Sequence, residues 1–186
     1  MVQPLITRNI PAEFITSNHY IFGQIKVANT GLMGQLSDTT SSHLEINDAS
    51  IARIVKQEKI INYASVLWVV KAQLVAVSLQ KPDYVGSAVL VRGGYVRYAS
   101  YPIQVTTPVY EITGTLEWIG RFDFSVIMGD GTNAFLILYD AAVSATLFPN
   151  FRLECPALLL NRRFIDTLVY VKKTPVKETS GQERSG

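Results

Sequence analysis

The sequence has little of the chemistry that active sites and disulfide frameworks use. Its 186 residues include one cysteine and two histidines, and only 17% of them are charged. The single cysteine, Cys155, excludes an intrachain disulfide and a cysteine-cluster metal site. Because Cys155 lies beside an apolar run, we expect it to be a small buried hydrophobe. The net charge of +2 is too small to argue for a nucleic-acid partner.

Long apolar runs are also missing. No stretch approaches the ~18 uninterrupted apolar residues of a membrane-spanning helix. The first eleven residues lack the basic stretch followed by an apolar stretch that marks a signal peptide. We therefore expect no membrane span, and a cytoplasmic location.

Candidate catalytic and metal-ligating groups are sparse. His19 and His43 do not neighbour a nucleophile motif such as Gly-x-Ser-x-Gly, so a hydrolase triad has no support. A metal site built from His19, His43, Glu45 and Asp48 lacks the i, i+4 histidine spacing of a helical zinc motif, and a solvated strand face is the better interpretation. The prediction is a protein that is not an enzyme and holds no cofactor or metal.

What the sequence does contain is an internal repeat. Three segments recur in the same order about 91 residues further along the chain. The pairs are Ile21-Phe22-Gly23-Gln24-Ile25 with Ile112-Thr113-Gly114-Thr115-Leu116, Leu44-Glu45-Ile46-Asn47-Asp48-Ala49 with Leu136-Ile137-Leu138-Tyr139-Asp140-Ala141, and, more loosely, Val69–Val75 with Leu159–Ile165. A duplicated β-module explains this recurrence. Asp48 and Asp140 each close a matching strand, where we expect a structural role, accepting hydrogen bonds from the backbone of the next turn.

Strand patterns dominate both copies. In His43-Leu44-Glu45-Ile46-Asn47 the apolar residues alternate with polar ones, which predicts a half-buried antiparallel strand. Val66–Leu79 predicts two short strands around a turn at 71–73, and a helical turn or two is expected only near 49–57. Trp68 and Trp118 lie in apolar strands, so both are expected in the core.

These patterns predict an all-β protein of two tandem, duplicated small β-modules. The expected boundaries are an N-terminal arm at 1–11, copy one at 12–86, a hairpin connector at 87–102, copy two at 103–173 and a disordered tail at 174–186. Each copy has only a marginal core of its own, so the copies should share an interface or assemble with other chains.

The connector carries the most suggestive cluster of large polar and aromatic side chains. Gly93 and Gly94 suit the positive φ angles of a type I′ hairpin between Ala88–Arg92 and Tyr95–Tyr98. Tyr and Arg are enriched in protein interfaces, and they can also stack on bases and neutralise phosphates. We expect a protein interface here, formed by Arg92, Tyr95, Arg97 and Tyr101.

Two segments resemble the motifs of Sm-like small β-barrels. Leu32–Asp38 followed by Leu44–Ala49 is similar to the first motif of that family, and Val91–Val96 to the second. The doublet is also similar to duplicated bacterial β-barrel proteins of unassigned function. The resemblance to the Sm-like family implies that each copy is a small, strongly bent five-stranded β-barrel of the SH3-like and Sm-like type. It also implies a ring oligomer, with His43, Arg92 and Tyr95 as RNA-contacting residues.

The function expected from the sequence is a structural or scaffolding module that acts through protein–protein contacts and self-assembly, most simply as a homo-oligomer. An Sm-like RNA-binding protein and a small-ligand-binding barrel remain the alternatives.

Overall fold

The computed structural model describes residues 7–28, 30–86, 98–129 and 134–171, and these are mostly β-strand. The strands are β1 (Arg8–Thr16), β2 (His19–Val27), β3 (His43–Arg53), β4 (Lys56–Val70), β5 (Leu74–Leu79), β6 (Tyr98–Thr106), β7 (Tyr110–Ile119), β8 (Phe135–Ala145), β9 (Phe148–Asn161) and β10 (Thr167–Tyr170). The helices are α1 (Gly31–Ser37) and α3 (Phe124–Gly129), with 3₁₀ turns η1 (Lys71–Gln73), η2 (Pro82–Tyr84) and η4 (Arg162–Phe164). The all-β class predicted from the sequence is confirmed.

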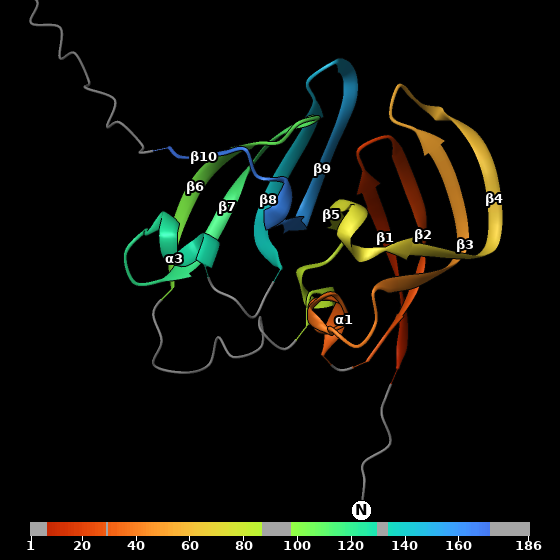
Figure 1. The fold of residues 1–186 in the computed structure, drawn as a ribbon, viewed down its shortest axis with the longest axis horizontal. Coiled ribbons are helices and arrows are strands. Elements are labelled where there is room, and N and C mark those ends of the chain that lie inside the picture. The colour runs from red at the N-terminus through yellow and green to blue at the C-terminus, as the bar shows by residue number, and fades with distance from the viewer. Residues whose placement is uncertain (1–6, 29, 87–97, 130–133, 172–186) are drawn as a thin grey trace, which may run out of the picture.

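These strands form one antiparallel sheet of ten in the order β10-β6-β7-β8-β9-β5-β1-β2-β3-β4. The order has two ends, so the sheet does not close on itself within the described residues. β10 lies at one end of the molecule and β4 at the other (Figure 1).

The same strand order occurs in each half of the sheet. β1 to β5 are arranged β5-β1-β2-β3-β4, and β6 to β10 are arranged β10-β6-β7-β8-β9. A short helix follows the second strand of each half, and a 3₁₀ turn separates the fourth from the fifth. Residues that hold the same place in the two halves are called counterparts below. Val69 and Leu160 are an example, since they pair with Leu44 and Leu136 respectively.

Each half bends at one glycine and one aspartate on adjacent strands. The β2–β3 register shifts between Phe22 and Gln24, and Asp48 on the facing strand has a φ of +50°. A Cβ built on Gly23 would clash with Ile46 Cγ2 and with the Asn47 carbonyl oxygen, so no side chain fits at this crossing. In the second half, the matching register shift between β7 and β8 spans Gly114 of β7. Asp140, on the facing strand β8, has a φ of +47°. Such bulges bend a strand sharply and increase its twist. The two aspartates therefore lie at bends inside β3 and β8, and not at strand ends as predicted.

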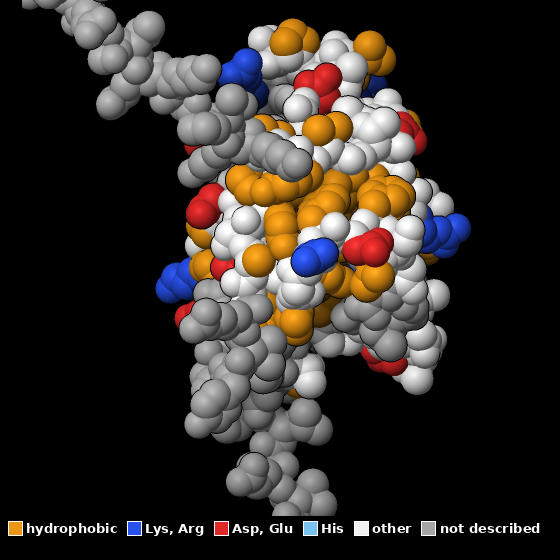
Figure 2. All heavy atoms as spheres, turned by 90° about the vertical axis from the view of Figure 1, so that its left-hand side faces the viewer, with side chains coloured by type: hydrophobic (Ala, Val, Ile, Leu, Met, Phe, Trp, Pro, Cys, Tyr) orange, Lys and Arg blue, Asp and Glu red, His pale blue; other side chains and the backbone are white. Residues whose placement is uncertain are grey.

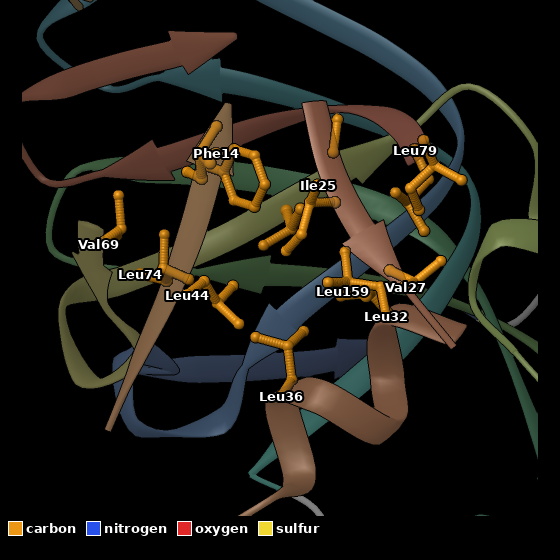
Figure 3. Packing of buried hydrophobic residues seen from close by; sticks show 14 of the residues in the cluster. Phe14, Ile25, Val27, Leu32, Leu36, Leu44, Val69, Leu74, Leu79 and Leu159 are labelled. Carbon is orange, nitrogen blue, oxygen red and sulfur yellow. The ribbon is translucent and has the colours of Figure 1, made fainter. Parts of the chain in front are cut away.

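Two hydrophobic cores fill the concave faces that these bends create. The first core contains residues such as Phe14, Ile25, Leu44 and Leu79, mostly from β1 to β5 (Figure 3). The second is built mainly by β6 to β9, around Tyr110 and Phe151. Tyr110 connects the halves, because its hydroxyl donates a hydrogen bond to the Thr16 carbonyl at 2.6 Å.

Several local expectations need correction. Residues 49–57 contain no helix, since β3 and β4 run through them. Residues 31–37 form the helix α1, although the sequence patterns predict no helix there. Trp68 is 61% exposed on β4, whereas Trp118 packs against the second core. Residues 88–97 of the predicted hairpin lie outside the described residues, and its last residue, Tyr98, begins β6.

Candidate assembly surface

The two halves meet where β5 lies beside β9. Four antiparallel pairs join them: Ala76 with Leu160, Val77 with Leu159, Ser78 with Leu158, and Leu79 with Ala157. All six residues of β5 are buried, as are the last five of β9. A strand that is buried on both faces is typically a nearly continuous apolar run, and both segments are apolar apart from Ser78 and Asn161.

Side chains cross this junction into the core of the other half. Leu159 belongs to β9, yet it packs in the first core with Val27 and Leu79 (Figure 3). Ala157 of β9 belongs to the same core. In the other direction, Ala76 of β5 packs in the second core. The fourth strand of one half therefore completes the core of its neighbour.

Polar groups at the junction are paired. Ser78 donates its hydroxyl hydrogen to Glu13 Oε2 at 2.7 Å. Asn161, at the end of β9, donates from Nδ2 to the Leu74 carbonyl at 2.9 Å. The Cys155 thiol is buried as predicted, and burial raises its pKa to about 11. A thiol with so high a pKa is a poor nucleophile at neutral pH, which agrees with a packing role.

The edge strand β4 ends in the counterpart of that buried segment. Val66–Val70 corresponds to Ala157–Asn161, and both segments are almost wholly apolar. The described residues place no strand against the outer edge of β4. Val66 is 38% exposed, Trp68 61% and Val70 49%, whereas their respective counterparts Ala157, Leu159 and Asn161 are all buried. An apolar segment that is covered in one half is thus open in the other.

The opposite edge strand, β10, is also apolar and uncharged. Val169 is 52% exposed, while the Tyr170 ring lies 5.3 Å from that of Phe122 and 5.4 Å from that of Tyr101. Figure 2 shows a band of hydrophobic side chains across this end of the sheet. Exposed apolar residues here come from β6, β7, α3, β10 and the residue that follows β10, and they are Tyr98, Ile119, Phe124, Val126, Val169 and Val171. Contiguous apolar patches of this kind mark interaction surfaces.

Of the interface residues predicted in the connector, the structure describes Tyr101. Arg92, Tyr95, Arg97, Gly93 and Gly94 lie outside the described residues. Tyr101 lies on β6, half-buried, and its hydroxyl donates a hydrogen bond to the Gly120 carbonyl at 2.6 Å. It therefore supports the aromatic cluster beside β10.

His43 is exposed at the start of β3, in a shallow polar hollow. The hollow is also lined by Lys26, Glu45 and Asn47. Lys71 borders it, but its ammonium donates to the backbone carbonyls of Gln35 and Asp38. Burial lowers the pKa of Lys71, and the Asp38 carboxylate opposes that shift. Its hydrogen bonds fix Lys71 against the end of α1.

The described residues were also compared with the requirements of a metal site and of a membrane span. No group of three or more His, Cys, Asp and Glu side chains there could hold a metal ion. None of the helices found in that part has the length and apolar character needed to cross a bilayer.

The exposed apolar strand ends of β4 and β10 are candidate assembly residues that the sequence analysis does not identify. One signal was present: neither Val66–Val70 nor Thr167–Tyr170 contains a charge, although edge strands usually carry one to prevent unwanted pairing.

Comparison of the chain with protein-family models, with curated proteins and with solved structures finds no match.

Proposed function

We propose that the chain consists of two tandem copies of a small, strongly bent, five-stranded open barrel and acts as a self-assembling structural module. It works through protein–protein contacts and performs no chemistry of its own. The first copy corresponds to β1–β5 and the second to β6–β10.

The duplication is supported by details that β-rich composition alone would not repeat. Gly23 with Asp48, and Gly114 with Asp140, occupy matching bends. The first hairpin of each half also closes in the same way. Thr16 Oγ1 accepts a hydrogen bond from the His19 amide at 3.0 Å, and Thr107 Oγ1 accepts one from the Tyr110 amide at 2.8 Å.

A single observation carries the assembly proposal: Val66, Trp68 and Val70 of β4 are exposed, while the matching residues of β9 are buried beside β5. Burying one large apolar side chain stabilises a protein by about 1.5–3 kcal/mol. An apolar strand edge without charge is a template for another strand. Covering this edge therefore favours association with another polypeptide.

The direct test is the absolute mass of the purified chain by light scattering at micromolar concentration. We expect a defined assembly of several chains without any added ligand. A monodisperse monomer would overturn the proposal. Absorbance at 260 nm is recorded on the same material, because bound RNA that dissociates steeply with salt would favour the RNA-binding alternative.

A further inference from the structure

We infer that the strand covering β4 is β10 of a second copy of this chain, so that copies join head to tail in the geometry of the internal β5–β9 junction. This inference rests on the proposed function and specifies its interface. The partner is a second copy because the chain already contains both halves of the same contact: β4 is the counterpart of β9, and β10 is the counterpart of β5.

Applying the residue pairing of β5 with β9 to β10 of one copy and β4 of another predicts a definite register between the copies. The pairs at the junction are Ala76–Leu160, Val77–Leu159, Ser78–Leu158 and Leu79–Ala157. β5 and β10 correspond through their pairing with β1 and β6, and β4 and β9 through their pairing with β3 and β8. The pairs expected between copies are Thr167–Val69, Leu168–Trp68, Val169–Leu67 and Tyr170–Val66.

The side chains of the two free edges fit this arrangement. Trp68 takes the place of Leu159, which crosses the internal junction into the first core. Trp68 should therefore enter the second core of the next copy beside Leu168, which is only partly buried there.

The surface of the second half that would receive Trp68 is less completely buried than the equivalent surface of the first half. Val27 and Leu79 are fully buried in the first core, where Leu159 is packed. Their counterparts are Trp118 and Tyr170, and both keep part of their surface exposed. Charge does not oppose the contact, since neither Val66–Val69 nor Thr167–Tyr170 contains an ionisable acid or base other than the tyrosine.

Joining unlike surfaces makes the contact heterologous. Each copy keeps one free β4 and one free β10, so addition continues until a ring closes or a filament grows. A symmetric dimer through two β4 edges would instead stop at two chains.

Disulfide trapping tests the register. The double variant Leu67→Cys, Val169→Cys places two thiols at one expected pair. Cys155 is retained because it is buried, and the parent chain treated in the same way is the control. The matched control, Ser65→Cys with Val169→Cys, moves one thiol two residues along β4. Mild oxidation of the first variant should give a reducible ladder of covalent multimers, several-fold stronger than that of the shifted control.

Two single variants separate this inference from the proposed function. Neither Leu67→Cys nor Val169→Cys alone should cross-link to itself, but a mixture of the two should give a covalent dimer. Self-cross-linking of Leu67→Cys, or an assembled protein that yields no ladder, would overturn the head-to-tail contact and leave self-assembly standing. A monomeric parent chain would overturn both.

A substitution at Trp68 tests the inserted side chain. Trp68→Glu should reduce the assembly to single chains while preserving the circular dichroism spectrum, because Trp68 is largely exposed within one copy. Tyr63→Glu is the matched control on the same strand, 72% exposed and outside the expected register. An unchanged mass for Trp68→Glu, or equal dissociation of both variants, would contradict insertion of Trp68.

Discussion

Asp48 and Asp140 show how one residue type sets the curvature of each half. Both adopt left-handed backbone angles, which cost most L-residues of order 1 kcal/mol but which aspartate tolerates better than most. Both side chains are exposed, so their recurrence is explained by backbone conformation at a bulge. The internal repeat identifies Asp48 and Asp140 as equivalent residues. The alternation of apolar and polar residues before Asp48 does not show that β3 continues past it.

Substitution of Asp48 separates a backbone role from a side-chain role. We expect Asp48→Gly to leave the free energy of unfolding unchanged or raise it by up to about 1 kcal/mol, because glycine adopts a positive φ without strain. Asp48→Val should lower it by about 1–3 kcal/mol, because a β-branched side chain clashes there. Urea denaturation measures both. Equal losses in the two variants would mean that the carboxylate itself holds the bend.

At the scale of elements, alternation predicted what lies within one strand. His43–Asn47 is half-buried as expected, and a turn does separate two strands at 71–73. α1 could not be predicted, because its seven residues include two glycines and it is held by contacts from distant segments. The Met33 amide, for example, donates to the Val85 carbonyl at 3.0 Å.

The candidate surface escaped prediction for a related reason. Val66–Val70 and Ala157–Asn161 are similarly apolar, so composition predicts that both are buried. Which of the two lies at an edge depends on how distant strands pair, and that information is not local. The apolar sequence around Trp68 therefore predicts a core position, whereas the side chain is mostly exposed.

Lys71 offers a test of how α1 is attached. Its ammonium donates to the carbonyls of Gln35 and Asp38, at the end of the helix where backbone oxygens lack partners. Lys71→Met keeps the apolar stem and removes both hydrogen bonds, so it should cost about 1–3 kcal/mol of unfolding free energy. Thermal or urea denaturation measures the loss. Lys56→Met, at an exposed lysine on β4, is the control and should change stability by less than about 0.5 kcal/mol. Equal effects would show that the buried hydrogen bonds contribute nothing.

At the scale of the whole molecule, the two cores are interdependent. Leu159 and Ala157 cross into the first core, Ala76 crosses into the second, and the Tyr110 hydroxyl reaches Thr16. Neither half can lose its packing without exposing apolar surface of the other. The internal repeat in the sequence indicates two modules, but only the pairing of β5 with β9 makes them one folding unit.

We therefore expect both halves to unfold together. Ile46 is fully buried in the first core, and Ile46→Val should lower the free energy of unfolding by about 1 kcal/mol. In hydrogen exchange followed by mass spectrometry, the most protected amides of β2 in the first half and of β7 in the second should lose protection by the same amount. Tyr63→Ser, a change at an exposed position, should leave both unaltered. Loss of protection confined to β2 would mean that the halves open independently, and that the β5–β9 junction is weaker than its burial indicates.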